Sequence, residues 1–498
     1  MRKFVFLITI AIILLFVSCD INLDEDIEVS YNITSSGQIS LANKSAKLPQ
    51  LLEIPSTVDG IEVTSLSSGM FFYHDELKYV ILPVTITEIP YEAFYRCSSL
   101  YGVFAPGGIT KIGERAFYKC TSLGGLDTSS VKYVYVSAFQ GCSSYEKIDL
   151  SSVEQLWDYA FMDCSNLKQV TLGENLKYRV GGDYILGNNI FVGCNKLENF
   201  EVDSDKTNFY TIDDNKGLVA NYNGKNRLVS YPTASGAVTL PSDIIEIESG
   251  AFSGCTGLTS VDFPDNLKSI GSIAFKNCTS LTSISIPTSV TTIESSAFKN
   301  CTCPLVFEDG RKSIADGQYI DDAYYSINLA GASFSSISIP ASVEGNLSGL
   351  SGCSCPIILT GSRTEIPEYF FQYCSSIPSI TMPESVTTIG SHAFSGCTRL
   401  QKVKISKNVT TISETAFEGC TGTVVFSSGM STIPAKALYN SNVSAVAIPK
   451  SVTTIGVSAF ANCSYLDDIY YEGTIDEWND EWDKGLWVNI HYETYPGP

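Results

Sequence analysis

Residues 284–301 read ISIPTSVTTIESSAFKNC and contain the pattern that decides the fold. The first three, Ile284–Ile286, alternate apolar and polar side chains, and the proline that follows them cannot donate a hydrogen bond within a sheet. Ile293, Ala297 and Cys301 then follow at intervals of four, which places them on one face of a short helical turn. The stretch predicts one strand and one turn that share an apolar inner edge. A single unit cannot bury that edge, so several copies must stack.

The same unit recurs along most of the chain. Fifteen copies keep the frame, and neighbouring copies are mostly 22 or 23 residues apart, which predicts a solenoid. Twelve copies have a phenylalanine three residues before a cysteine, and these are Phe94, Phe117, Phe139, Phe161, Phe191, Phe252, Phe275, Phe298, Phe371, Phe394, Phe417 and Phe460. The three weaker copies are Phe71 with His74 at the cysteine position, Leu350 with Cys353, and Leu438 with Ser441.

The repeat resembles that of the BspA-like family of leucine-rich repeat surface proteins. Residues 281–301 match its pattern apart from Glu294 at the glycine position, and residues 380–400 carry the glycine as Gly390. The resemblance covers about residues 50–472. It implies a curved, right-handed leucine-rich repeat solenoid of about fifteen rungs, β-rich with short helical turns, and with a parallel sheet on one face. It also implies a bacterial cell-surface protein that contacts host matrix or other cells.

The domain boundaries follow from where the repeat begins, fails and ends. We predict a signal peptide at 1–18, a lipid-anchored tether and first cap at 19–49, the solenoid at 50–472, and a C-terminal cap at 473–498. An elongated repeat at 199–247 looks like a hairpin excursion that turns at Asn223-Gly224, and an irregular repeat lies at 303–355. Three tryptophans are predicted to close the open end of the core, namely Trp478, Trp482 and Trp487.

The first nineteen residues have the features of an export signal. Arg2 and Lys3 precede an apolar run over residues 4–17, which is too short to span a bilayer with ease. Residues 16–19 then resemble a bacterial lipobox, which implies cleavage before Cys19 and acylation of that residue. The alternative is plain secretion with loss of Cys19. The lipoprotein interpretation predicts a cell-envelope protein on the cell surface or outer membrane, bound to the membrane only through its anchor.

Composition excludes several classes of function. The chain has 53 acidic and 32 basic side chains, a net charge of −21, which argues against nucleic-acid binding. Only three histidines occur, and neither a nucleophile motif nor a phosphate-binding loop is present. We therefore predict no enzyme activity, no cofactor and no metal site. Two acidic loops, around residues 203–205 and 213–217, resemble oxygen-ligand loops but do not match the full calcium motif.

The cysteines are best interpreted as core residues. Thirteen of the sixteen occupy one position of the repeat, where a free thiol behaves as a small buried hydrophobe. Cys303 and Cys355 depart from the frame, and three alternatives stay open for them: an inward residue of a shortened rung, a disulfide, or a zinc site. The predicted repeat core includes Phe94, Cys97, Phe117, Cys120, Phe275, Cys278, Phe298, Cys301, Phe394 and Cys397.

The remaining candidate for function is the outer surface of the predicted sheet. The strand residue ten after each phenylalanine should point outward, and solenoids bind partners with such extended faces. The candidate binding residues are Tyr101, Phe104, Asp127, Asp149, Glu201, Asp262 and Tyr470. We predict an adhesin-like protein that binds protein partners, such as host extracellular matrix or other cells. The alternative is a structural or assembly lipoprotein within the envelope, which Asp20 after the acylated cysteine favours.

Overall fold

A computed structural model describes residues 27–176, 179–180, 183–184, 186–203, 208–222, 224–320, 323–350, 352–479, 482 and 488–494. The predicted signal peptide, Cys19, Asp20, Asp205, Asn223 and Trp487 lie outside these residues. The chain divides into two compact units, residues 1–211 and 212–498, and each is described by itself. Strand β19 (Phe209–Ile212) runs across the boundary.

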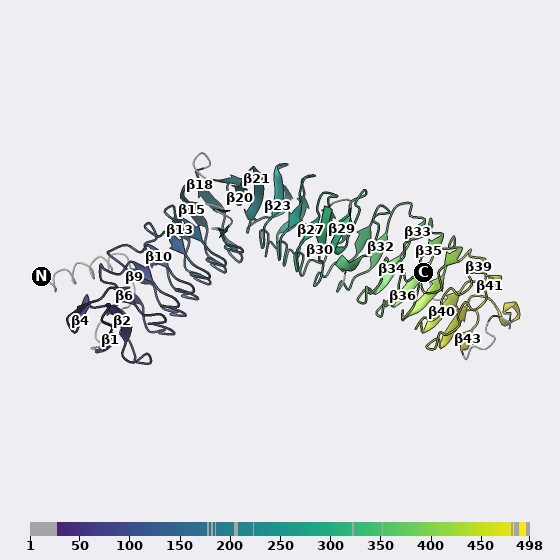
Figure 1. The fold of residues 1–498 in the computed structure, drawn as a ribbon, viewed down its shortest axis with the longest axis horizontal. Coiled ribbons are helices and arrows are strands. Elements are labelled where there is room, and N and C mark those ends of the chain that lie inside the picture. The colour runs from purple at the N-terminus through teal and green to yellow at the C-terminus, as the bar shows by residue number, and fades with distance from the viewer. Residues whose placement is uncertain are drawn as a thin grey trace. The chain divides into compact units, whose positions relative to one another are not determined.

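The first unit is a stack of rungs, each contributing strands to two parallel ladders. Figure 1 shows β10, β13, β15 and β18 following one another in chain order within this unit. The first ladder comprises two parallel sheets, formed by β3 (Leu51–Glu53), β7 (Tyr79–Ile81), β9 (Gly102–Phe104) and β11 (Gly125–Leu126), and by β13 (Lys147–Leu150), β15 (Gln169–Leu172) and β18 (Asn199–Val202).

The second ladder of the first unit runs through two-residue strands. Ile89, Ile112, Val134 and Leu156 are aligned in it and face the core with almost no exposure. Its strands are β8 (Glu88–Ile89), β10 (Lys111–Ile112), β12 (Tyr133–Val134) and β14 (Gln155–Leu156). At the N-terminal end, β2 (Gln38–Leu41) pairs with β6 (Ser65–Leu66) in parallel and with β1 (Tyr31–Ile33) antiparallel. Two short hairpins complete the unit: β4 (Thr57–Val58) with β5 (Ile61–Glu62), and β16 (Arg179–Val180) with β17 (Asp183–Tyr184).

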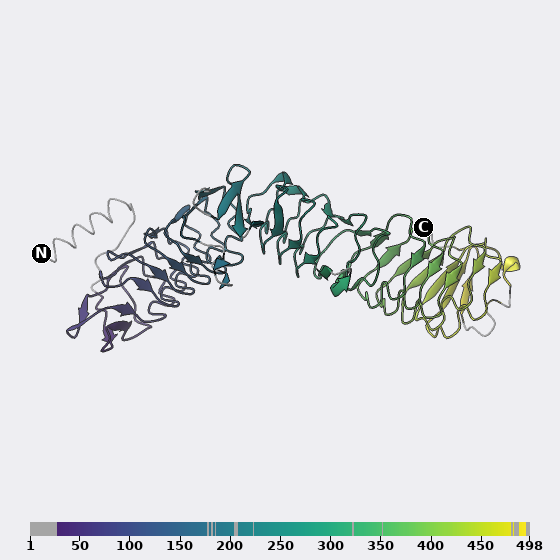
Figure 2. The same ribbon diagram turned by 45° about the horizontal axis from the view of Figure 1, so that its top comes forward.

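The second unit repeats this plan over more rungs. Figure 2 shows the strands of its largest sheet side by side, in green to yellow. That ten-stranded parallel sheet comprises β26 (Ile284–Ile286), β28 (Leu305–Phe307), β31 (Ile337–Ile339), β32 (Ile357–Leu359), β34 (Ser379–Thr381), β36 (Lys402–Ile405), β38 (Thr423–Phe426), β40 (Ala445–Ile448), β42 (Asp468–Tyr471) and β43 (Asn489–His491). Before it, β22 (Gly236–Thr239) pairs with β24 (Leu258–Asp262). The second ladder uses β21 (Lys225–Ser230), β23 (Ile244–Ile247), β25 (Ser269–Ile270), β27 (Thr292–Ile293) and β30 (Ala323–Ile327), then β33 (Glu365–Ile366), β35 (Thr388–Ile389) and β37 (Thr411–Ile412), and finally β39 (Thr432–Ile433) with β41 (Thr454–Ile455).

Where neighbouring rungs both carry the motif phenylalanine, the two rings stack, from Phe71 to Phe191, from Phe252 to Phe298 and from Phe371 to Phe417. The ring centroids of Phe94 and Phe117 are 5.2 Å apart with nearly parallel planes, and those of Phe117 and Phe139 are 5.4 Å apart. The amide of Phe94 also donates to the carbonyl of Ala116, the residue before the next phenylalanine, at 2.8 Å. Neighbouring rungs are therefore joined at the phenylalanine position both by a backbone hydrogen bond and by ring stacking.

The repeat cysteine joins the rungs a third time. The Cys120 thiol donates to the carbonyl oxygen of Phe94 in the preceding rung at 2.9 Å, and Cys142 donates to Phe117 in the same way at 3.0 Å. The contact recurs in the second unit, for example from Cys278 to Phe252 at 3.1 Å. Every residue of the predicted repeat core is at most 1% exposed.

The short helical turn predicted around each phenylalanine is wrong. Two residues of this segment have left-handed backbone angles. One lies two positions before the phenylalanine and the other two positions after it, as Ser296 (φ 60°) and Asn300 (φ 64°) do around Phe298. Each interrupts a helical path, so the segment is a succession of tight turns instead. Among the described residues, helix is limited to two three-residue 3₁₀ segments, η1 (Ser348–Leu350) and η2 (Ile475–Glu477).

The solenoid has about 18 turns, more than the fifteen copies visible in the sequence. Tyr231 occupies the phenylalanine position of a rung without the motif, since its amide donates to Ala251 O and its carbonyl accepts from Cys255. Leu329 does the same, with its amide on Gly349 and its carbonyl accepting from Cys353. Both rungs lie inside intervals that appear as insertions in the sequence.

Two antiparallel hairpins extend the second ladder of this unit. The hairpin predicted within the elongated repeat is present, because β20 (Gly217–Tyr222) pairs antiparallel with β21, and β21 pairs in parallel with β23. A second hairpin, which the sequence analysis did not predict, joins β29 (Asp316–Ile320) to β30, and β30 pairs in parallel with β27. The hairpins thus continue the ladder rather than replace it.

Two shortened rungs with the same unusual interior begin at the two ends of the irregular repeat predicted at 303–355, at Cys301 and at Cys353. Each begins Cys-x-Cys-Pro and carries an arginine six residues after the first inward strand residue, where a regular rung has a valine such as Val290. Arg311 is fully buried and donates to the carbonyls of Pro287 and Val290 in the preceding rung, at 3.1 and 2.7 Å.

Arg363 repeats that arrangement two rungs later. It donates to the carbonyls of Pro340 and Val343, which are the equivalent positions of its own preceding rung. Both guanidinium groups lie near an aromatic ring, at 4.9 Å from the centroid of Phe307 and 4.5 Å from that of Phe370 respectively. Each shortened rung therefore replaces a core valine by a cation whose hydrogen bonds go to main-chain oxygens.

Candidate functional site

The first two predicted binding residues flank one strand of the first unit. Phe104 ends β9 and lies partly exposed opposite Ile81 of β7. Tyr101, immediately before β9, is 38% exposed, and its ring stacks on the buried ring of Tyr79 at 5.9 Å. The pair combines partly buried rings with an accessible surface, which suits anchor residues of protein interfaces.

The carboxylates of Asp127 and Asp149 are exposed, and each also holds a local turn. Asp127 Oδ1 accepts from the amide of Ser129 at 3.0 Å, and Asp149 Oδ1 accepts from the amide of Ser151 at 2.9 Å. The hydrogen bonds from Ser129, first its backbone and then its side chain, lower the pKa of Asp127. The two aspartates lie on neighbouring rungs, because Thr128 Oγ1 donates to the carbonyl of Asp149 at 2.7 Å.

Glu201 belongs to the same sheet row as Asp149. The register aligns Asp149 with Thr171 and Thr171 with Glu201, and Thr171 Oγ1 donates to Glu201 Oε2 at 2.8 Å. The structure therefore places Asp127, Asp149 and Glu201 along one exposed acidic row, in which the rung of Thr171 separates Asp149 from Glu201.

The last two predicted binding residues belong to the second unit. Asp262 is the exposed final residue of β24. Tyr470 lies in β42, where its ring stacks on that of His491 at 4.8 Å, and His491 Nε2 contacts Asp468 at 2.8 Å. Tyr470 is thus part of the packing between the last two strands as well as partly exposed.

Two of the three C-terminal tryptophans, Trp478 and Trp482, belong to the described residues and pack against each other. Trp478 is buried and contacts the rings of Tyr471 and Trp482 edge-on, at centroid distances of 5.2 Å each. These rings adjoin the last strands of the sheet, which agrees with a role in closing the core.

A second surface, missed by the sequence analysis, lies on the turns of the first rungs. Phe72, Tyr95 and Tyr118, each directly after a core phenylalanine, form a row of stacked rings with centroid spacings of 4.8 and 4.9 Å. We call these three residues the turn row. Phe72 is 41% exposed, and Tyr73 beside it is 50% exposed and packs edge-on against Phe72 at 4.6 Å.

Cations accompany the turn row in an otherwise acidic chain. The Arg96 guanidinium lies 5.5 Å from the centroid of Tyr73 and 5.9 Å from that of Tyr95. Lys119 lies 5.6 Å from the centroid of Tyr118. The sequence signal was available, since each of the first three copies has an aromatic residue after its phenylalanine, whereas later copies mostly have serine, lysine, glutamine or glutamate.

The thiols have little capacity for chemistry. All fifteen cysteines of the described residues are free, and burial raises the pKa of the Cys142 thiol far above its ordinary value. Cys303 and Cys355 are also buried and free, which supports their interpretation as inward residues of shortened rungs. Burial raises the pKa of Cys355 to about 11. A thiol kept neutral in this way is a poor nucleophile and a poor metal ligand.

Two further structural findings concern metals and membranes. Over the part of the chain that the structure describes, no three His, Cys, Asp or Glu side chains gather as a metal site would need. These described residues also contain no helix that is long and apolar enough to cross a bilayer.

Several bacterial proteins of known structure are similar to this chain. A leucine-rich repeat protein from Eubacterium ventriosum is 21% identical, with a TM-score of 0.49, and the match covers 74% of this chain and 92% of that one. A leucine rich cell surface protein from Faecalibacterium prausnitzii is 21% identical, with a TM-score of 0.40 and coverage of 93% and 98%. A leucine-rich repeat protein from Bacteroides ovatus is 21% identical, with a TM-score of 0.37 and coverage of 94% and 99%. No protein with a curated description matches the chain.

The family follows from a match to the sequence itself. A model of the BspA type leucine rich repeat region matches residues 64–198, 231–308 and 356–482, in six copies. These segments make up more than half of the chain and include the regular rungs of both units. The chain belongs to the BspA-type leucine-rich repeat family, as residues 281–301 predicted.

Proposed function

We propose that the chain is a cell-surface lipoprotein that binds protein partners in an adhesin-like manner through the turn row of its first unit. The observation that carries this proposal is the exposure of Phe72 and Tyr73 beside Tyr95 and Arg96 on a repeat scaffold. Clustered exposed aromatic rings mark interaction surfaces on soluble domains, and tyrosine and arginine are enriched among residues that dominate binding energy.

The sheet residues predicted from the sequence form a second surface for such partners. The acidic row of Asp127, Asp149 and Glu201 favours a basic partner by electrostatic steering, and Tyr101 with Phe104 supplies apolar contact area. We propose protein components of a host matrix or of other cells as partners. The binding requires neither catalysis nor a cofactor, in keeping with a repeat scaffold.

A binding experiment tests the turn row. Cells that display the full chain are applied to immobilised matrix proteins, and Tyr95→Ala with Tyr118→Ala is compared with the parent chain. The matched control is Tyr439→Ala, because Tyr439 follows a core residue at the same place in a rung of the second unit. We expect the double variant to lose binding at least tenfold, corresponding to about 1.4 kcal/mol, and the control to retain it. Equal losses in both would remove the turn row from the proposal.

The anchor and the location need separate tests. Incorporation of a labelled fatty acid that stops in Cys19→Ser would support acylation of Cys19. Protease treatment of intact cells, with an intracellular and a periplasmic protein as controls, should remove the chain while both controls persist. Full protection of the chain would favour the alternative, a structural or assembly lipoprotein inside the envelope.

A further inference from the structure

His74 is the first member of the repeat-cysteine position, and it is a different residue for a physical reason. In the rungs that follow, a cysteine donates to a phenylalanine carbonyl of the preceding rung, and Cys97 does so to Phe71 at 2.8 Å. His74 precedes Cys97 in this position, and its imidazole Nε2 lies 3.0 Å from the carbonyl oxygen of Lys44, in the segment before the first complete rung. The longer side chain thus makes the same kind of contact to an irregular segment.

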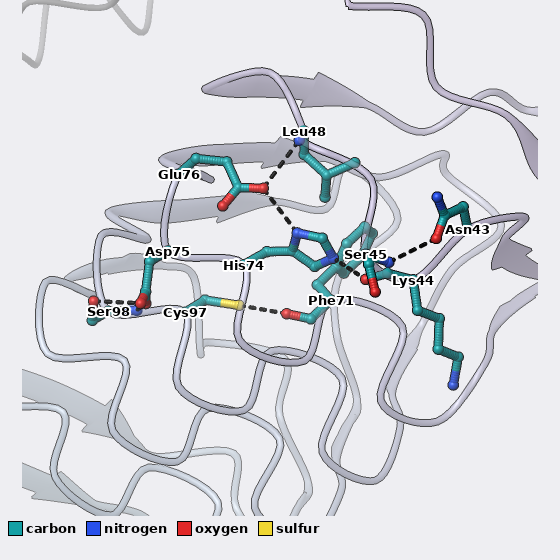
Figure 3. A network of polar contacts seen from close by, with 10 residues as sticks. All are labelled: Asn43, Lys44, Ser45, Leu48, Phe71, His74, Asp75, Glu76, Cys97 and Ser98. Atoms are coloured by element: carbon teal, nitrogen blue, oxygen red, sulfur yellow. Dashed lines mark hydrogen bonds and ion pairs between the residues drawn. The ribbon is translucent and has the colours of Figure 1, made fainter.

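Both ring nitrogens of His74 face groups that can only accept. Figure 3 shows the imidazole between the Lys44 carbonyl and the carboxylate of Glu76. Nδ1 lies 2.9 Å from Glu76 Oε1, and that oxygen also accepts the amide of Leu48 at 3.0 Å. A neutral imidazole has one N–H and one lone pair, so it can satisfy only one of the two acceptors. With an ionised Glu76, both contacts form only when the ring carries both protons.

The charges around the ring favour an ion pair of His74 and Glu76. Burial alone would raise the pKa of Glu76, but hydrogen bonds from His74 and from backbone amides leave it below its ordinary value. Asp75, the next residue, directs its carboxylate to the amide and hydroxyl of Ser98 instead, at 3.0 and 2.8 Å. Burial raises the pKa of the Cys97 thiol, so it stays neutral. In Figure 3 the Lys44 side chain extends away from the imidazole.

We propose that a doubly protonated His74 and an ionised Glu76 form a latch that holds residues 43–48 on the first rung, and that loss of the second ring proton opens it. His74 is only 5% exposed, so its hydrogen bonds are not exchanged for water while the segment is closed. Once the ring is neutral, one of its nitrogens presents a lone pair to an acceptor, either the Glu76 carboxylate or the Lys44 carbonyl, and that contact is lost. The latch is therefore closed when the ring is charged and Glu76 is ionised, and it opens on either side of that range.

The two edges of that range have opposite causes. On the alkaline side the ring loses a proton, so it can donate to only one of its two acceptors, Glu76 or the Lys44 carbonyl. At the acid edge Glu76 gains a proton. The pKa of Glu76 is lower in the folded chain than in the unfolded chain. Its ionised form therefore stabilises the closed latch fully above the unfolded-state pKa, and this stabilisation is lost as the pH falls through the folded-state pKa.

Hydrogen exchange of the full chain tests the latch. Protection of the peptide covering residues 43–50, corrected for intrinsic exchange, is measured at about pH 5.5 and about pH 8.5. We expect protection to fall about tenfold at the higher pH, the scale of one charge-assisted hydrogen bond. A peptide around Phe117 in a regular rung should not change and serves as the folding control. Constant protection at residues 43–50 would overturn the proposal.

Two variants separate the latch from a general loss of structure. Glu76→Gln places an amide beside the ring that can donate to a neutral Nδ1 while its oxygen still accepts from Leu48. Its protection should therefore be the same at both pH values. His74→Cys restores the usual repeat residue, which is too short to reach Lys44, so residues 43–50 should be poorly protected at both. A Glu76→Gln variant that loses protection at high pH as the parent does would contradict the latch.

Discussion

The regular rungs at residues 94–161 and the shortened rungs at residues 301–374 have the same backbone frame and different interiors. In the regular rungs, valines, phenylalanines and cysteines fill the core. The buried side-chain hydrogen bonds between these rungs are those that the thiols donate to phenylalanine carbonyls. In the shortened rungs, Arg311 and Arg363 stand where a valine belongs, and each donates to two equivalent carbonyls of the rung before.

This difference shows which part of the repeat is fixed. The parallel strands continue without interruption from β26 through β28, β31 and β32, although the side chains between them change from apolar to cationic. A buried cation is costly unless its hydrogen bonds are made. Main-chain oxygens accept from three nitrogens of Arg311 and from one terminal nitrogen of Arg363, whose buried Nε has no acceptor. Backbone pairing therefore determines the frame, and the interior must fill the available space and satisfy its own polar groups.

The largest expected effect concerns the arginines. Arg311→Ala leaves a cavity and removes the donors for Pro287 and Val290, so we expect the local opening free energy of its rung to fall by about 3–5 kcal/mol. Hydrogen exchange of peptides at residues 284–314 measures it. Arg311→Met is the matched variant, because Met430 fills the equivalent position of another short rung. Lys404→Ala, on an exposed strand residue, is the control. If methionine costs as much as alanine, the hydrogen bonds rather than the filled volume stabilise this rung.

The next effect is a dependence on alkaline pH. Burial raises the pKa values of the thiols in the folded chain above the unfolded-state pKa of about 8.5. Their contribution to the free energy of unfolding is therefore complete below that pH and is lost as the pH rises above it. At pH ~10 the opening free energy at Cys142 should be lower by about 2 kcal/mol. Alkylation rates of individual cysteines, corrected with a model peptide, measure this. The rung that holds both Cys301 and Cys303 has two buried thiols, so its opening free energy should fall by more than that of a regular rung. Equal decreases in the two rungs would contradict this expected difference between the shortened and the regular rungs.

Shortening one ring of the phenylalanine stack should have a smaller effect. Phe117→Leu removes part of a buried ring that stacks on both neighbours, and we expect a cost of about 1–2 kcal/mol in the opening of its rung. Leu438 and Leu350 already occupy this position elsewhere, so the fold tolerates leucine there. Alkylation of Cys120 reports the opening. A cost above that of Arg311→Ala would reverse the proposed order of the two regions.

The smallest expected effect is that of the thiol hydrogen bond. Cys120→Ser keeps a donor but shortens its reach to Phe94 O, and we expect a loss of about 1 kcal/mol or less. Ser441 shows that serine is accepted at this position. Cys120→Ala, which has no donor, should cost more than serine in hydrogen exchange of the same rung. The reverse order would show that the thiol serves only to fill space.

The sequence predicted the repeated interior well, for a simple reason. Burial selects apolar residues at fixed intervals, so the positions of Phe94, Cys97 and their equivalents are visible as a period. The rungs at Tyr231 and Leu329 were not among the fifteen copies, because backbone hydrogen bonds define them while their side chains differ from the motif.

Other features could not be predicted because their causes are local geometry or a neighbouring rung. The left-handed residues include Glu92, Arg96 and Lys119, types that do not signal such a backbone, so the spacing of four was interpreted as a helix. Arg311 is accepted in the core only because carbonyls of the preceding rung lie within reach. The turn row was recognisable as three successive aromatic pairs, but nothing in the sequence showed that their rings stack.

The bond from each phenylalanine amide to the residue before the next phenylalanine also bears on how this chain can change length in evolution. Phe94, Phe117 and Phe139 all make it between equivalent main-chain groups, so deleting or duplicating one whole regular repeat rejoins the same donor and acceptor. A rung with a buried arginine lacks this independence, since Arg363 needs the carbonyls of Pro340 and Val343 in the rung before it. Recombination can therefore add or remove regular rungs one at a time, whereas an arginine rung also needs a predecessor that presents these two carbonyls to the guanidinium group.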